Sequence, residues 1–150
     1  FELNLSVIDL THFVFGLSLA YILDKRLVTC SAFALAPDLD ISFDFLYPFT
    51  NLGIMHSLLA AGVFTFLVYV YTEDRVSAES CFIGYAVSGL GLDLVTNYGI
   101  PLFFPALGNF SLSLAASNSL APNLAIIIVS IVLMLEKKHN LISIDFPSNL

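Results

Sequence analysis

The chain has 150 residues, of which 58% are hydrophobic and 11% are charged, and its formal net charge is −7. Because a soluble domain carries about 25% charged residues, this composition excludes an ordinary soluble domain and indicates an integral membrane protein. The five basic residues are too few for a nucleic-acid-binding surface, so no nucleic-acid partner is expected. The length fits a single membrane-embedded helical domain over residues 1–150.

Five apolar segments predict five main hydrophobic helices. They cover residues 10–23, 27–36, 56–71, 80–96 and 121–135. The first segment shows neither a basic n-region nor a small-residue cleavage site, so we expect it to be retained. The second should end near Ala36, because a residue that precedes a proline avoids helical dihedrals. Its length of about 15 Å would cross only half of the bilayer core.

Two further segments are predicted to be irregular. Residues 41–55 combine aromatic residues with Pro48, Asn51 and Gly53, which indicates a short interfacial helix followed by a loop. Residues 97–119 contain prolines and glycines among apolar residues, and we expect an outer loop that packs near polar side chains. The expected fold class is therefore all-α, an integral membrane helical bundle with a short second helix and an irregular outer loop.

The basic residues predict the orientation of this bundle. If the helices alternate in direction, all five basic residues fall on one side, which the positive-inside rule assigns to the cytoplasm. Both cysteines should lie near that side, and we interpret them as small packing residues. The basic residues are Lys25, Arg26, Arg75, Lys137 and Lys138, and the cysteines are Cys30 and Cys81.

Five ionisable residues interrupt the apolar sequence, where an uncompensated charge is costly. Counted along the helices from the basic turns, His12 and Asp38 should lie roughly 18 Å from the cytoplasmic end, and His56 and Asp93 roughly 26 Å. We therefore expect one polar pocket toward the outer half of the membrane. Its predicted residues are His12, Asp38, Asp40, His56 and Asp93.

This set of residues predicts a metal site. Clustered carboxylates do not all stay ionised beside one another without a cation. Two imidazoles with two or three carboxylates suit Zn²⁺, Mn²⁺ or Fe²⁺ better than Ca²⁺, and Zn²⁺ or Mn²⁺ is the expected ion. All five residues are candidate ligands, and the three aspartates are also candidate catalytic residues. A cation with an open coordination position activates water, which supports hydrolysis of an ester or phosphoester.

Each candidate also has a purely structural interpretation. Asp38 and Asp40 could cap a helix, because Pro-Asp commonly begins one. His12 alone could be a buried histidine with satisfied hydrogen bonds, and His56 could lie at the membrane interface. Thr96 could cap its helix or support Asp93. An intramembrane carboxylate such as Asp93 is a functional candidate by default.

The motifs resemble the family of predicted membrane-bound, metal-dependent hydrolases, which includes LexA-binding, inner-membrane-associated members. The resemblance spans residues 11–105 and implies a metal site on a membrane protein. The matching motifs are Thr11-His12 with Gly16, Leu35-Ala36-Pro37-Asp38-Leu39-Asp40, Gly53-Ile54-Met55-His56-Ser57, Asp93-Leu94-Val95-Thr96, and Gly99-Ile100-Pro101-Leu102 with Pro105.

Two positions depart from the family pattern. The family usually has a histidine four residues before the aspartate that corresponds to Asp93, and this chain has Gly89 there. The family usually has another histidine where this chain has Asn51. The resemblance therefore implies either fewer metal ions, such as one, or a site that has lost catalysis.

Three functions remain open at this point. The first is a membrane-embedded, metal-dependent hydrolase that acts on a membrane lipid or a lipid-linked ester or phosphoester. The second is a non-catalytic scaffold or accessory subunit that assembles with other membrane-protein subunits. The third is an ion or proton pathway that uses the same intramembrane acids.

Overall fold

The computed structural model describes residues 7–40, 54–97, 99–106, 108–114 and 119–139. Over these residues the chain is all-helical, which confirms the predicted fold class. Its main chain contains no strand in the described ranges, and only one isolated antiparallel bridge joins Ile100 to Phe110.

The N-terminal part forms two antiparallel helices and a short 3-10 turn. Helix α1 covers Val7–Ile22, α2 covers Leu27–Ala34, and η1 covers Pro37–Asp40. The amides of Leu35 and Ala36 donate to the carbonyls of Ala32 and Phe33, respectively, and end α2 just before the proline, as the sequence predicts. The chain then continues in η1 without crossing the rest of the bundle.

The central hairpin consists of α3 (Leu58–Thr72) and a continuous helix over Arg75–Val95. This long helix has three parts: α4 (Arg75–Phe82), a π-helical segment η3 (Ile83–Leu90), and α5 (Gly91–Val95). The predicted start near residue 80 is wrong, because Asp74 caps the helix by accepting hydrogen bonds from the amides of Val76 and Ser77. The predicted start of α3 at His56 is also two residues early, since Ser57 is its N-cap.

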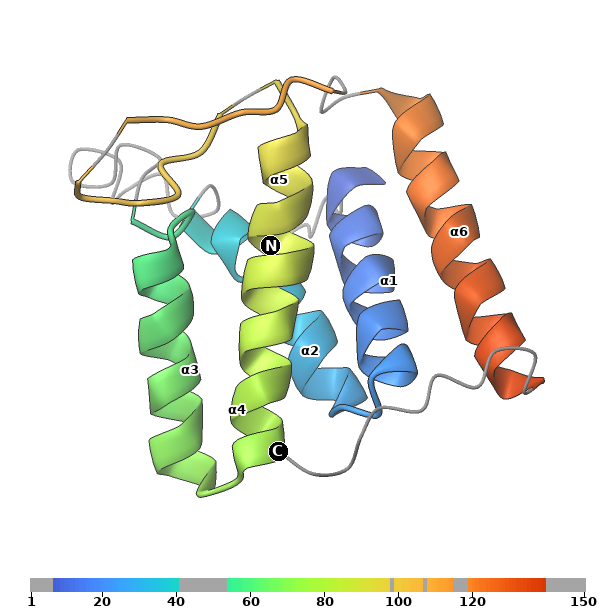
Figure 1. The fold of residues 1–150 in the computed structure, drawn as a ribbon, viewed down its shortest axis with the longest axis horizontal. Coiled ribbons are helices and arrows are strands. Elements are labelled where there is room, and N and C mark those ends of the chain that lie inside the picture. The colour runs from blue at the N-terminus through green and yellow to red at the C-terminus, as the bar shows by residue number, and fades with distance from the viewer. Residues whose placement is uncertain (1–6, 41–53, 98, 107, 115–118, 140–150) are drawn as a thin grey trace, which may run out of the picture.

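The last helix, α6 (Leu120–Lys138), lies beside α1 at one edge of the bundle (Figure 1). It is longer than the predicted 121–135 and keeps both lysines of its last turn helical. The amine of Lys137 donates hydrogen bonds to the carbonyls of Tyr21 and Ile22 and to the carboxylate of Asp24. These bonds attach the end of α6 to the end of α1.

Close contacts through glycine pack α2 against both α1 and the long helix. A Cβ atom added at Gly84 would lie 2.1 Å from the carbonyl oxygen of Cys30, and one at Gly16 would lie 2.8 Å from Cβ of Ala34. Only glycine therefore permits these helices to approach so closely. Both cysteines are free and buried, in agreement with a packing role.

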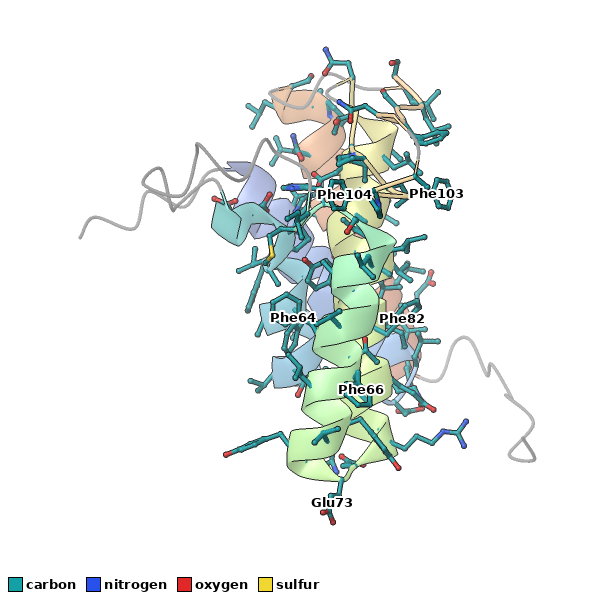
Figure 2. The ribbon with its side chains drawn as sticks, turned by 90° about the vertical axis from the view of Figure 1, so that its left-hand side faces the viewer. Phe64, Phe66, Glu73, Phe82, Phe103 and Phe104 are labelled. Carbon is teal, nitrogen blue, oxygen red and sulfur yellow. The ribbon has the colours of Figure 1, made fainter. Side chains whose placement is uncertain are left out.

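The basic residues gather at one end of the bundle. Lys25 pairs with Glu79, Arg26 with Asp74, and Arg75 with Glu79. With the bond between Lys137 and Asp24, this confirms that the three basic regions share one end. Figure 2 shows Glu73 at this end and Phe103 and Phe104 at the other. The assignment of this end to the cytoplasm stays a prediction.

Two helices are long and apolar enough to cross a membrane: Arg75–Val95 and Leu120–Lys138. Helices α1 and α3 contribute shorter apolar stretches. Large apolar side chains face outward on α3, such as Phe66 with 64% and Val70 with 57% of its surface exposed. Lipid chains are the natural environment for such a surface.

Residues 99–106 and 108–114 cross the end of the bundle opposite the basic residues (Figure 1). Ile100 and Pro101 are buried, and Leu102 accepts a hydrogen bond from the amide of Leu58 at the start of α3. The amide of Leu112 donates to the carbonyl of Leu94 in α5. The described part of the loop therefore packs on the bundle end as predicted, whereas residues 41–53, with the predicted interfacial helix, lie outside the described residues.

Candidate functional site

Four ionisable side chains from four parts of the chain meet inside the bundle. His12 comes from the first half of α1, Asp38 from η1, His56 from the turn before α3, and Asp93 from α5. The sequence predicts a pocket of these four residues and Asp40, and the structure brings the four into contact. Their role as metal ligands stays a prediction.

The carboxylate of Asp38 contacts both histidines. Its Oδ2 lies 3.2 Å from Nδ1 of His12, and its Oδ1 lies 3.7 Å from Nε2 of His56. Because a carboxylate only accepts, the bond to His12 places a proton on Nδ1 of that imidazole. Asp38 therefore fixes the tautomer of His12 and leaves Nε2 available for another partner.

The carboxylate of Asp93 also contacts both histidines, from the opposite side of the pair. Its Oδ1 lies 3.4 Å from Nε2 of His12, and its Oδ2 lies 3.6 Å from Nε2 of His56. The four side chains thus form a closed ring in which histidine and aspartate alternate. Suitable ligand atoms of His12, Asp38 and Asp93 all lie within 4.8 Å of one another.

The ring is enclosed by protein. His12 is 2% exposed and His56 is 5% exposed, whereas the side chains of Asp38 and Asp93 keep 19% and 15% of their surface accessible. Two carboxylates in such a setting need compensating positive charge. Protons on the imidazoles or a bound cation would supply it.

Local structure positions two of the four side chains, those of Asp38 and His56. The buried Pro37 begins η1 and turns the chain so that Asp38 follows directly beside α1. Ser57 caps α3 by accepting the amide of Ala60, and its hydroxyl donates to the carbonyl of Ile54. These two bonds close the tight turn that carries His56.

The heights predicted for the two pairs differ by roughly 8 Å, yet the structure places them at one level. The reason is an offset between the two helical hairpins. The amide of Arg26 donates to Oγ of Ser80, so the turn between α1 and α2 lies more than one helical turn up the long helix from Arg75. Five residues at 1.5 Å each account for about 7.5 Å.

The other residues singled out in the sequence do not join the ring in the described part of the structure. Asp40 ends η1, but its side chain lies outside the described part of the structure, as do Asn51 and the 41–53 segment. The hydroxyl of Thr96 donates to the main-chain carbonyl of Asp93 at 2.7 Å, which is the bond expected of a helix-ending residue. Gly89 faces Pro37, not the ring: a Cβ atom there would lie 2.7 Å from Cγ of Pro37.

Two buried hydroxyls near the ring were missed by sequence reasoning. The hydroxyl of Tyr85 donates to the carbonyl of Met55 at 2.6 Å, and that of Ser88 donates to the carbonyl of His12 at 2.8 Å. Both residues are completely buried in η3. Tyrosine and serine within a segment rich in small residues fit ordinary helix packing equally well, so the sequence offers no signal that separates these roles.

Comparison with known protein families identifies the family of this chain. The model of the YdjM inner membrane protein family matches residues 8–145. No curated protein and no solved structure matches the chain. The matched region includes every member of the ring of His12, Asp38, His56 and Asp93.

Proposed function

The chain belongs to the YdjM inner membrane protein family, and we propose that in the membrane it acts as a metal-dependent hydrolase on a lipid or lipid-linked ester or phosphoester. The family match supports the membrane location, and the hydrolase activity is our inference. One observation carries it: two histidines and two carboxylates form a closed, buried ring in an otherwise apolar bundle.

The spacing of the ring suits a small divalent cation. Ligand atoms around a tetrahedral Zn²⁺ lie about 3.3–3.6 Å apart when the bonds are about 2.0–2.2 Å long. The contacts between Asp93 and the two histidines measure 3.4 and 3.6 Å, and that between Asp38 and His56 measures 3.7 Å. The donor set of two imidazoles and two carboxylates fits Zn²⁺ or Mn²⁺.

In the proposed site, some ring residues would bind the cation and one would orient a ligand. Nε2 of His12, Nε2 of His56 and the carboxylate of Asp93 would hold the cation. Asp38 would orient His12 through the Nδ1–H bond, an arrangement in which a carboxylate raises the basicity of a metal-binding imidazole. Its second oxygen, Oδ1, lies near His56 and could complete the ligand set. Asp40 remains a candidate ligand and candidate catalytic residue.

A bound cation would supply a Lewis acid that activates water for attack on an ester or phosphoester. The chain itself contributes enclosure, because both histidines are almost completely buried. It also contributes two partly exposed carboxylates, Asp38 and Asp93, as groups that can accept a proton from the attacking water.

A lipid substrate agrees with the surroundings of the ring. The loop that bonds to Leu58 and Leu94, close to His56 and Asp93, exposes apolar side chains. Leu112 is 56% exposed and Leu114 is 74% exposed. With the basic end in the cytoplasm, this loop and the ring would lie toward the outer half of the membrane.

A second candidate function is a non-catalytic scaffold or accessory subunit of a membrane complex. The contact between Gly89 and Pro37 favours it, because it leaves no room for the histidine that the resembled family carries at this position. The same contact also fits a hydrolase with one cation, since the ring is complete without that histidine.

Elemental analysis of the purified, detergent-solubilised chain separates these functions. The hydrolase predicts about one Zn²⁺ or Mn²⁺ per chain, and Asp93→Asn should lose it while the helical circular dichroism stays unchanged. Asp24→Asn is the matched control, because Asp24 is an exposed carboxylate at the opposite end. A metal-free wild-type chain that also takes up no added Zn²⁺ or Mn²⁺ would favour the scaffold.

A further inference from the structure

We propose that Tyr85 and Ser88 are positioning residues whose hydroxyls set the distance and orientation of the two ring histidines. This inference rests on the proposed metal site, but it concerns the geometry of His12 and His56 and can be tested without any metal. Both residues belong to the π-helical segment η3, which lies within the helix that carries Asp93.

The first contact is made by Ser88. A serine inside a helix usually bonds to a carbonyl of its own preceding turn. Ser88 instead donates across the bundle to the carbonyl of His12, at 2.8 Å. The bond is buried, so water does not compete with it, and it ties the main chain of one ring histidine directly to the long helix.

The second contact is made by Tyr85. Its hydroxyl donates at 2.6 Å to the carbonyl of Met55, the residue that precedes His56. Its ring stacks on Phe64 of α3, with centroids 5.5 Å apart, so the hydroxyl is presented by a side chain that packing holds in place. The second ring histidine is therefore tied to the same helical segment.

Together the two hydroxyls fix the positions of both ring histidines relative to one helical segment, η3. Tyr85 and Ser88 are three residues apart, and each fixes the main chain at or beside one histidine. The π-helical form of this segment is significant, because extra residues in a helical turn change which side chains face a neighbouring helix and occur often at functional sites. The segment therefore couples the positions of His12, His56 and Asp93.

The substitutions Tyr85→Phe and Ser88→Ala each remove one hydroxyl and leave the packing of the side chain intact. Ser31→Ala is the matched control. Ser31 is also completely buried, and its hydroxyl also makes one hydrogen bond, at 2.8 Å to the carbonyl of Leu27 in its own helix α2. All three variants lose a comparable bond, so a purely structural role predicts comparable effects.

Two measurements on the full chain in detergent distinguish a positioning role. In metal-free protein, the nitrogen NMR signals of the three histidine rings should shift for His12 in Ser88→Ala and for His56 in Tyr85→Phe, but for neither in Ser31→Ala. With Co²⁺ as the probe, both site variants should bind about tenfold or more weakly with an altered visible spectrum, as expected for groups that orient ligands.

The outcomes separate the two proposals. Histidine signals that stay the same in Tyr85→Phe and Ser88→Ala, together with unchanged Co²⁺ binding, would overturn the positioning role. Histidine signals that shift in these two variants, together with a wild-type chain that binds no Co²⁺, would support the positioning role and count against the metal-dependent function alone.

Discussion

Gly89 and Pro37 are packed so closely that a Cβ atom added to the glycine would lie 2.7 Å from Cγ of the proline and 3.1 Å from the carbonyl oxygen of Ala34. This contact joins the long helix to the start of η1, the segment that carries Asp38. The position of one ring carboxylate therefore depends on the absence of a side chain at Gly89.

Gly89→Ala should displace η1 and move Asp38 away from the histidines. Overpacking of this kind costs about 1–3 kcal/mol of folding free energy, and the affinity for Zn²⁺ should fall with it. Denaturant unfolding in detergent and metal titration measure the two effects. A variant that unfolds and binds as the wild type does would show that the contact has no such role.

Gly62→Ala is the control for this prediction. Among the described residues, no atom outside the helix backbone would lie within 4 Å of a Cβ atom at Gly62, which is in the interior of α3. Alanine there should stabilise the helix by roughly 0.5–1 kcal/mol and leave metal binding unchanged.

Asp38→Asn should weaken metal binding without abolishing it. Asparagine keeps the size of the side chain and an oxygen that can accept the Nδ1–H bond of His12, but it removes the negative charge. Loss of such an orienting carboxylate typically lowers affinity about 10–100-fold. Competition with a chelator measures this change, and affinity equal to that of the wild type would contradict the orienting role.

Lys137→Met should loosen α6 from α1. The substitution removes three hydrogen bonds, to Tyr21, Ile22 and Asp24, but keeps an apolar stem. Asp24 is largely exposed, so screening limits the expected loss to about 1 kcal/mol. Thermal unfolding should show this loss, whereas Lys138→Met at the exposed neighbouring position should be neutral, and equal effects of the two would argue against the attachment.

Acid should weaken the junction between α3 and α4 through Asp74. The hydroxyl of Ser77, the amide of Val76 and the guanidinium of Arg26 hold the pKa of the Asp74 carboxyl below its ordinary value. The ionised form is thus favoured by folding. Its stabilising effect is complete above the pKa of the unfolded chain, about 3.9, and is lost as pH falls through the lower pKa of the folded state.

Asp74→Asn isolates this effect, because asparagine is an equally good N-cap that does not titrate near pH 4. The fall in melting temperature below about pH 4 should be smaller in the variant than in the wild type. Parallel melting curves at every pH would show that Asp74 does not contribute to the acid response.

Hydropathy and charge predict the helices of this chain well, because both depend on local sequence. The end of α2 follows from Pro37, and the shared basic end follows from the even number of helices between the basic regions. The predicted start of the long helix is too late, because the cap at Asp74 extends the helix into a charged stretch whose composition indicates a turn. Cap geometry outweighs composition at that point.

The meeting of His12, Asp38, His56 and Asp93 follows from their isolation in an apolar sequence, because buried charges cluster. Their exact level does not, since it depends on the offset that the bond between Arg26 and Ser80 introduces. The roles of Tyr85 and Ser88 depend on which carbonyl each hydroxyl reaches across the bundle. Such long-range contacts leave no periodic pattern in a single sequence.

The four elements that supply the ring follow one another along the chain, from His12 in α1 to Asp93 in α5. During synthesis, the ribosome would deliver Asp93 last of the four, after α3 and α4 have entered the bilayer. Until then, the nascent chain holds the two ring histidines and only one of the two ring carboxylates, that of Asp38. Under the proposed function, a cation would meet the complete ring only once the second hairpin has been inserted, so metal loading would be a late step in the biogenesis of this protein.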